Sequence, residues 1–463
     1  MQGVQLAELL AETPPGVAEA LEVVGGFDAA LANGLARLGP RHTEALNALA
    51  GALSASPLGT ALTDASAKLA GGAIGDAELT ALAGARAALL GAAHDALLTR
   101  LDGALGRSRT AWEERPAEGE PVPANLLAAA RSWLRDLAIA GWLGVDDALV
   151  SAADQAVEAV WGEPRLRRLA VLLDGLAAEL RVSSPVATME RLPERRWADL
   201  WTRAVLLSHS GSWTGGTTTV SGRLLPLGVD VHEHGTAVQA QLHAVLEPEG
   251  EGPVRLVRVA VAAAKVDTIL GPEVWKLLTA YPTLLAALAE HRAVDVADMR
   301  LTAGGDLLWD EERAEAGEPA DPFATARVRL PGAEAPAVAP LDRHPVRIAE
   351  PVLVEGYKAR RDGTFDLNGE ALTVDLDRLP PSGPLTAQLV TASTACIGLL
   401  RWDAGRWTLQ PLAVQSTVKK QPVEAHNGDW ALGPTDPKIV KAQARSGDPV
   451  AVLTERAGRL LRK

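Results

Sequence analysis

The chain has 463 residues, of which 47% are hydrophobic and 22% charged, as is typical of a globular protein with a large core. Its net charge of −13 argues against a nucleic-acid-binding protein whose affinity comes from neutralising phosphates. The single cysteine, Cys396, excludes an intramolecular disulfide and any zinc site built from several cysteines. At about 150 residues per domain, the length predicts roughly three domains.

Residues 1–210 are predicted to form an all-α domain. Apolar residues recur at helical spacing over residues 76–105. Asp146 is a predicted N-cap, because its carboxylate can accept the N–H groups of a first helical turn. Further helices are predicted at residues 27–38, 41–53, 125–140, 146–161 and 164–181, with a loop at residues 113–123.

A helix at residues 192–208 is the clearest of the set. Trp197 and Trp201 lie four positions apart on one face, where they supply a large apolar area. Packing inside the helical domain is the main interpretation of these two tryptophans. Binding of a partner protein is the alternative.

Beyond residue 217 the apolar residues alternate with polar ones, which predicts strands. We expect a hairpin of residues 225–231 and 238–246, with Val231 opposite Val238. The remaining elements are a strand at 254–261, a helix at 271–291 and strands at 299–301 and 306–309. Together they predict an α+β domain, residues 211–310, with a small antiparallel sheet.

Residues 311–340 are rich in Ala, Glu and Pro and are predicted to form a linker, with residues 324–330 as an alternative edge strand. Residues 341–463 are predicted to form a β-rich domain, a sandwich or an OB-like barrel, closed by a C-terminal helix. Its strands are predicted at residues 346–356, 364–367, 372–376, 385–391, 397–402 and 406–412. The fold class is therefore multidomain α+β.

The N-terminus lacks the basic and apolar regions of a secretory signal, and no apolar stretch is long enough for a transmembrane helix. We therefore expect a cytoplasmic bacterial protein with no membrane partner. A P-loop, a Gly-x-Gly-x-x-Gly loop and a His-Glu-x-x-His motif are all missing from the sequence. Their absence argues against the common nucleotide hydrolases and zinc proteases, and we expect no cofactor.

Two short segments are weak candidates for chemistry. Asp230, His232 and His234 alternate along a predicted strand and are weak candidate metal ligands, although a polar hairpin tip is the main interpretation of this segment. His209, Ser210 and Ser212 lie in a polar segment between two predicted domains and are candidate hydrolase residues. An interdomain loop is the simpler interpretation of that segment, because a nucleophile and its base are normally brought together from separate elements.

The remaining polar groups are given structural interpretations. Cys396 precedes an apolar run and is predicted to be a buried thiol. Asp306, Asp310, Glu311 and Glu312 follow or flank a predicted strand end and are predicted to be solvated. The basic clusters, which are candidate docking points for an acidic partner, are Lys419–Lys420 and Arg456, Arg459, Arg462 and Lys463.

Two tryptophan-containing segments, residues 195–204 and 400–414, resemble uncharacterised actinobacterial proteins. Those proteins are associated with gene sets for a MoxR-type AAA ATPase, a von Willebrand A protein and a SWIM zinc-finger protein. The resemblance implies a non-enzymatic accessory that acts with a AAA ATPase or a von Willebrand A partner. It carries no catalytic residue over to this chain.

The leading hypothesis is thus an acidic, tryptophan-rich adaptor or scaffold, with Trp197, Trp201, Trp402 and Trp407 as candidate partner-binding residues. A hydrolase or metal-dependent enzyme is the first alternative. Weak single-strand nucleic-acid binding is the second, with Trp402 and Trp407 as stacking platforms in the C-terminal domain, although the acidic charge makes a nucleic-acid partner an unfavoured one.

Overall fold

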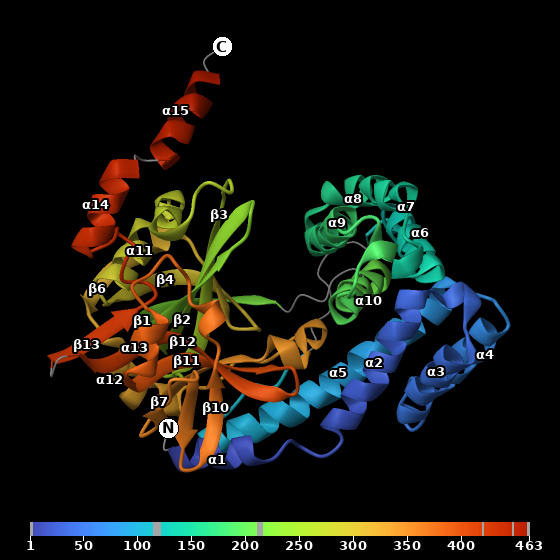
Figure 1. Ribbon diagram of the computed structural model, residues 1–463, viewed down its shortest axis with the longest axis horizontal. Helices are drawn as coiled ribbons and strands as arrows, with labels where there is room; N and C mark the ends of the chain where they lie inside the picture. Colours follow the sequence, from blue (N-terminus) through green and yellow to red (C-terminus); the bar gives the residue numbers. More distant parts are fainter. Residues whose placement is uncertain (1–2, 114–121, 211–215, 419–420, 447–448, 461–463) are drawn as a thin grey trace.

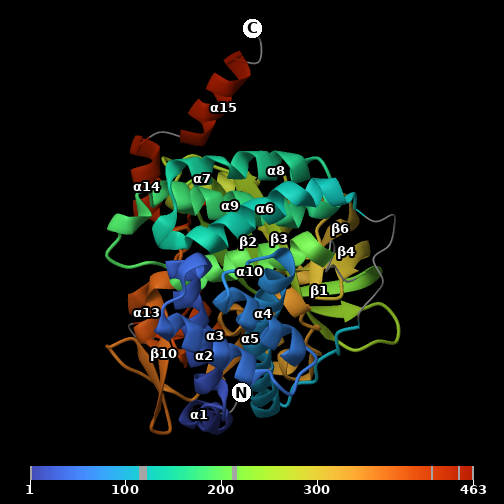
Figure 2. The ribbon, with the colours of Figure 1, turned by 90° about the vertical axis from the view of Figure 1, so that its right-hand side faces the viewer.

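The structure is a computed structural model, and it describes residues 3–113, 122–210, 216–418, 421–446 and 449–460 (Figure 1). As the sequence predicts, the protein is a multidomain α+β protein, helical in its first half and with two mixed sheets in its second. Most helices of the first half lie to one side of the sheets, and the long helix α5 (Asp76–Leu105) runs from the helical half to the second sheet (Figures 1 and 2).

The helical half follows the predicted periodicity. Helix α5 has the predicted bounds, and Asp146 caps α7 (Asp147–Ser151) by accepting the backbone N–H of Leu149 (2.8 Å). The other helices are α1 (Gly3–Ala11), α2 (Val17–Asn33), α3 (Pro40–Ala52), α4 (Gly59–Ala70), α6 (Ala124–Ala140), α7 (Asp147–Ser151), α8 (Ala153–Trp161), α9 (Arg167–Val182) and α10 (Glu194–Ser210).

Trp197 and Trp201 of α10 lie in the helical core, with 1% and 0% of their surface exposed. The indole nitrogen of Trp201 donates to the carbonyl oxygen of Leu134 (2.9 Å). The ring of Trp197 packs edge-on against Trp142, with centroids 6.1 Å apart. Packing is therefore the role of both residues, and neither offers surface for the alternative, partner binding.

The first sheet closes into a barrel, which we call barrel 1, within a stretch that the structure describes without a gap. Strand β1 pairs with β2 and with β4, β3 pairs with β2 and in parallel with β5, and β5 pairs with β4. The ring order is thus β1-β2-β3-β5-β4-β1, with helical segments between β3 and β4. This is the topology of an OB fold. Its elements are β1 (Thr217–Glu233), β2 (Ala237–Pro248), β3 (Arg255–Ala264), η5 (Gly271–Leu278), α11 (Pro282–Ala289), β4 (Arg292–Thr302) and β5 (Asp306–Leu308).

Strand β1 can join both halves of barrel 1 because it bends at Gly222. The β1–β4 ladder shifts register between Val220 and Gly222. A Cβ atom at Gly222 would lie 2.2 Å from the carbonyl oxygen of Glu247, so only glycine fits this bend.

The predicted hairpin register is wrong by two residues. Val231 pairs with Ala240, and Val238 pairs with Glu233. The ladder continues to the tip, where the His234 N–H donates to the carbonyl oxygen of Ala237 (2.8 Å), so the turn is shorter than predicted.

The second sheet repeats this topology, and we call it barrel 2. Strands β7 and β8 are separated by Gly356 and Tyr357 only and together take the place of a first strand. The order is β7-β11-β12-β10-β9-β8, β10 runs parallel to β12, and α13 lies between β10 and β11. The OB-like alternative predicted for the C-terminal domain is therefore the observed topology. Its elements are β7 (Ala349–Glu355), β8 (Lys358–Ala359), β9 (Thr364–Leu367), β10 (Glu370–Val374), α13 (Ala387–Thr391), β11 (Ser393–Asp403), β12 (Arg406–Val418) and β13 (Gln421–His426), which pairs with β12.

Two predicted segments differ from the structure. Residues 311–340, expected to be a linker, contain β6 (Ala314–Pro319), which pairs with β4, and α12 (Pro322–Val328), where an edge strand was the alternative. Asp321 caps α12 and Phe323 is fully buried, so apolar burial orders a segment whose composition resembles a linker. The strand expected at residues 385–391 is α13, because Thr386 caps a helical turn there.

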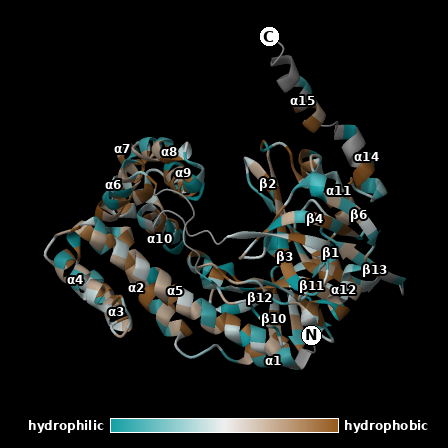
Figure 3. Ribbon diagram, turned by 180° about the vertical axis from the view of Figure 1, so that it is seen from behind, coloured by the Kyte–Doolittle hydropathy of each residue, from teal (hydrophilic) through white to brown (hydrophobic). Residues whose placement is uncertain are grey.

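Apolar side chains join the parts. Leu225 and Leu227 of barrel 1 pack with Ile397 and Ala413 of barrel 2 in one cluster that also includes Phe323. Helices α1 and α5 contribute to the core of barrel 2. Helices α14 (Pro437–Ser446) and α15 (Pro449–Leu460) pack Ile439, Val450 and Leu453 against the core of barrel 1, and the C-terminal end of α15 projects outward (Figure 1). Within the described residues no helix is both long and apolar enough to cross a membrane; α5, the longest, carries polar as well as apolar residues (Figure 3).

Candidate functional site

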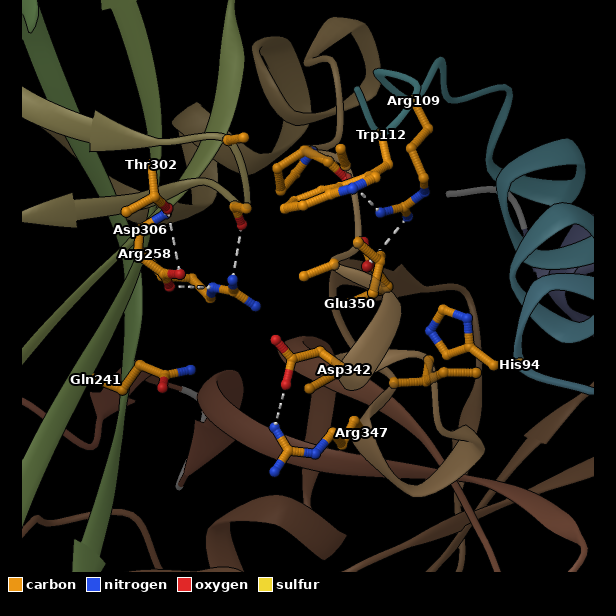
Figure 4. A pocket seen from close by; sticks show the side chains of 18 of the residues that line it. His94, Arg109, Trp112, Gln241, Arg258, Thr302, Asp306, Asp342, Arg347 and Glu350 are labelled. Carbon is orange, nitrogen blue, oxygen red and sulfur yellow. Dashed lines mark hydrogen bonds and ion pairs between the residues drawn. The ribbon is translucent and has the colours of Figure 1, made fainter. Parts of the chain in front are cut away.

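A polar pocket of about 390 Å³, which we call the junction pocket, lies where barrel 1 meets the helical half (Figure 4). One wall comes from barrel 1: Gln241 of β2, Arg258 of β3 and the β4–β5 turn, residues 302–306. The opposite wall comes from Arg109 and Trp112 after α5, Arg168 of α9 and the segment of residues 336–350 that leads into barrel 2.

Strand alternation explains why Gln241 and Arg258 face this pocket. Their neighbours Leu242 and Val259 point into barrel 1 and are buried, so Gln241 and Arg258 point outward. The two side chains thus lie on the outer face of the second and third strands of barrel 1. In OB folds this is the face that binds oligonucleotides and oligosaccharides.

Arg258 is held toward the pocket by the β4–β5 turn. Its Nε donates to Asp306 Oδ1 (3.0 Å), and its Nη2 donates to the carbonyl oxygen of Gly304 (2.7 Å) (Figure 4). Gly305 has a φ of 83° and gives the turn its shape. Asp306, predicted to be solvated, is half-exposed and forms part of the pocket wall.

Arg109 forms the opposite corner with Glu350. Arg109 makes two hydrogen bonds to Asp102 (2.7 and 3.0 Å) and an ion pair with Glu350 (3.1 Å). Burial alone would raise the pKa of Glu350, but Arg109 and Arg107 outweigh burial and hold that pKa below its usual range. Glu350 is therefore a charged, fixed support of the pocket.

A third corner of the pocket, beside those of Arg258 and of Arg109, contains two arginines and one carboxylate. Asp342 Oδ1 accepts from Arg168 Nη2 (2.7 Å) and from Arg347 Nη1 (2.9 Å). All three side chains are about one-third exposed, so solvent reaches this corner. The contact joins α9 of the helical half to the segment that leads into barrel 2.

A buried charge network lies behind this corner. Asp199 pairs with Arg203 (2.6 Å), and Arg86 donates to both carboxylate oxygens of Asp28 (2.7 and 3.0 Å). Arg86 and His344 both lie near Asp199, at 3.8 and 3.9 Å. Burial, helped by the surrounding arginines, lowers the pKa of His344 to about 4, so this imidazole is neutral at pH 7.

The residues predicted as metal ligands do not converge. Asp230 is buried and accepts from Arg401 (3.0 Å) and Gln410 (2.7 Å), and His232 lies 2.8 Å from it. His234 is exposed and contacts Thr236. Among the described residues no group of three or more His, Cys, Asp or Glu side chains has metal-binding geometry.

The predicted hydrolase residues form no described nucleophile–base pair. His209 is exposed at the end of α10 and contacts Ser208 and the carbonyl oxygen of Val205. Nothing is described for the side chain of Ser210, and Ser212 lies outside the described residues.

Trp402 and Trp407 pair across the β11–β12 hairpin with ring centroids 5.1 Å apart. They are only 3% and 5% exposed, so the predictions of partner binding and of base stacking are wrong for these positions. Cys396 is buried as predicted, and burial raises the pKa of its thiol. The side chains of the predicted basic clusters, Lys419–Lys420 and residues 456–463, lie outside what the structure describes.

Sequence reasoning did not find the junction pocket. Its arginines come from four elements far apart in the chain and share no local motif. The one local signal is Arg258, a charged residue in the middle of an apolar strand. No protein-family model, curated protein or solved structure matches this chain.

Proposed function

We propose that this protein is a binding protein that holds a small anionic ligand, bearing phosphate or carboxylate groups, in the junction pocket. The observation that carries this proposal is that, among the described residues, four arginines from four separate elements line one pocket: Arg109, Arg168, Arg258 and Arg347. Arginine is suited to such a ligand because its planar guanidinium can donate two parallel hydrogen bonds to an oxyanion.

Two further features support ligand binding here. The pocket includes the outer β2–β3 face of an OB topology, where such barrels bind their ligands. Trp112 is half-buried in the wall, and its indole gives an apolar surface beside the guanidinium groups (Figure 4). A ligand there would contact the helical half and barrel 1 together, as expected of an adaptor that responds to a small molecule.

Isothermal titration calorimetry with inorganic phosphate, pyrophosphate and citrate tests the proposal. We expect saturable binding of at least one of these anions with one site per chain. Arg347→Gln should weaken it about tenfold, the value of one charge-assisted hydrogen bond. Arg406→Gln, which removes an exposed arginine of the β11–β12 hairpin, is the matched control and should bind like the wild type. Equal affinity in wild type and Arg347→Gln would contradict the proposal.

We propose, as a second and separate function, that the protein is an adaptor for partners of an ATPase-centred system. One exposed residue favours contact with a protein partner. Trp161, at the end of α8, is 62% exposed, and tryptophan is favoured at interface hot spots. We expect Trp161→Ala to lose a partner that the wild-type protein captures from the native host. Val328→Ala, at a 70% exposed position on α12, is the control and should keep that partner. Capture that Trp161→Ala leaves intact would remove this residue from the adaptor hypothesis.

A further inference from the structure

We propose that Arg168 and Arg347 form a phosphate subsite of the junction pocket, and that Asp342 is an internal anion which the ligand's phosphate displaces. This inference rests on the proposed function and names the ligand class and its competitor at the same site. The two guanidinium groups come from α9 and from the segment before β7, and they meet at one oxygen of one carboxylate.

Arg168 and Arg347 hold one carboxylate oxygen of Asp342 between them, and we call these two arginines the clamp. Arg168 Nη2 and Arg347 Nη1 lie 2.7 and 2.9 Å from Asp342 Oδ1, which are distances of charge-assisted hydrogen bonds. Asp342, Arg168 and Arg347 all line the pocket and are partly exposed, so an incoming anion can reach both guanidinium groups.

The charge around the clamp is not balanced by the carboxylates beside it. The charged groups that act on Arg347 are two guanidiniums, Arg168 and Arg203, and two carboxylates, Asp199 and Asp342, so with Arg347 itself three positive charges meet two negative ones. His344 is neutral at pH 7, since burial lowers its pKa to about 4. Burial, with the neighbouring Arg203 and Arg168, lowers the pKa of Arg347, and Asp342 and Asp199 oppose this effect.

Asp342, which competes with the ligand for the two arginines, favours a phosphate ligand over one with a single carboxylate. A single carboxylate on a ligand would exchange like for like with Asp342, whose tethering gives it a high effective concentration at the clamp. A phosphate brings about two negative charges and three acceptor oxygens, so it can hydrogen-bond to both guanidinium groups through separate oxygens. Only a ligand of this kind gains charge and hydrogen bonds when it replaces Asp342.

Displacement of Asp342 would change contacts between residues 340–347 and the helical half. Leu341, the preceding residue, is buried in the helical core, and His344 lies beside Asp199 of α10. Residues 340–347 thus connect the pocket to α9 and α10. A phosphate between Arg168 and Arg347 would replace the Asp342 contact to α9 by a contact through the ligand.

The test compares Asp342→Asn with Asp154→Asn by calorimetry, with inorganic phosphate and pyrophosphate as probes. Both variants remove one negative charge and release an arginine of α9, Arg168 or Arg181, but Asp154 and Arg181 lie outside the pocket. We expect Asp342→Asn to tighten phosphate binding about tenfold, as follows from the loss of two partly exposed ion pairs. Asp154→Asn should change phosphate binding by less than about threefold. Circular dichroism spectra confirm that each variant is folded.

A second variant, Arg168→Gln, keeps the proposal testable if Asp342→Asn is poorly folded, because it should weaken phosphate binding without touching Asp342. Where Asp342→Asn does fold, its gain should fall below about threefold in the double variant with Arg168→Gln. Equal gains for Asp342→Asn and Asp154→Asn, or an unchanged affinity for Asp342→Asn or for Arg168→Gln, would overturn the internal-anion inference while the proposed function stands. If no anion binds to the wild type or to either Asp→Asn variant, the proposed function itself fails.

Discussion

The neutral, buried histidine behind the junction pocket predicts how stability depends on pH. Burial and the nearby Arg86, Arg347 and Arg203 lower the pKa of His344 to about 4, against the opposing effect of Asp199. The unfolded chain binds this proton near pH 6.5. As the pH falls from 6.5 toward 4, the unfolded state therefore gains protons that the folded state does not, and stability decreases.

The magnitude follows from the two pKa values. Between pH 7 and pH 5 the proton uptake of the unfolded state costs the fold about 2 kcal/mol for His344. His243 of β2 acts in the same direction, because burial and Arg258 lower its pKa to about 3. His291 acts in the opposite direction, since its hydrogen bond with Asp429 raises its pKa and stabilises the fold below pH 6.5.

His344→Asn isolates the contribution of His344. His344 Nδ1 accepts the backbone N–H of Val346 (3.2 Å), and an asparagine oxygen can accept that same hydrogen bond. The assay is the free energy of unfolding from urea titrations at pH 7 and pH 5, followed by tryptophan fluorescence. The wild type should lose about 2 kcal/mol more than His344→Asn between these pH values. His234→Asn, at an exposed position, is the control and should lose as much as the wild type. A loss in His344→Asn equal to that of the wild type would refute the argument.

Three further predictions concern stability and reactivity. Asp28→Ala should cost about 3–5 kcal/mol in urea unfolding, because it leaves Arg86 buried without its bidentate partner; a cost below about 1 kcal/mol would contradict this. Gly222→Ala should lower the melting temperature measured by circular dichroism, because its Cβ would lie 2.2 Å from the Glu247 carbonyl oxygen, and an unchanged melting temperature would mean that β1 can bend otherwise. Cys396 should react with a disulfide reagent only after unfolding in urea, because burial raises the pKa of its thiol, and rapid labelling of the folded protein at pH 8 would show that the thiol is accessible.

Elements whose signal is local were predicted well from the sequence. The bounds of α5 follow from the spacing of its leucines, and the Asp146 cap follows from one carboxylate at a helix start. Pairing between strands was predicted less well. The β1–β2 register differs by two residues because the ladder continues to the hairpin tip, and residues 311–340 are ordered by burial against distant strands.

The sequence predicted that the tryptophans share a helix face but not what covers that face. The spacing of Trp197 and Trp201 indicates a shared face, but a pattern along one helix does not say whether core or partner covers that face. The junction pocket was missed for a related reason. Arg168 and Arg347 meet only because the chain returns from barrel 1 to α9, and no spacing in the sequence records such a meeting.

The two barrels share one topology but differ in what lies opposite the outer face of their second and third strands. In barrel 2, Phe365 and Leu372 point into the core, where Leu6 and Leu9 of α1 join them. The outer face of β9 carries Asp366, which pairs with Arg360 at a partly exposed position. In barrel 1 the outer face of β2 and β3 carries Gln241 and Arg258, and Arg168 and residues 336–350 lie opposite these two side chains across the junction pocket. Because the outer face of barrel 1 is one wall of a pocket lined by arginines, barrel 1 is where we expect a ligand to bind.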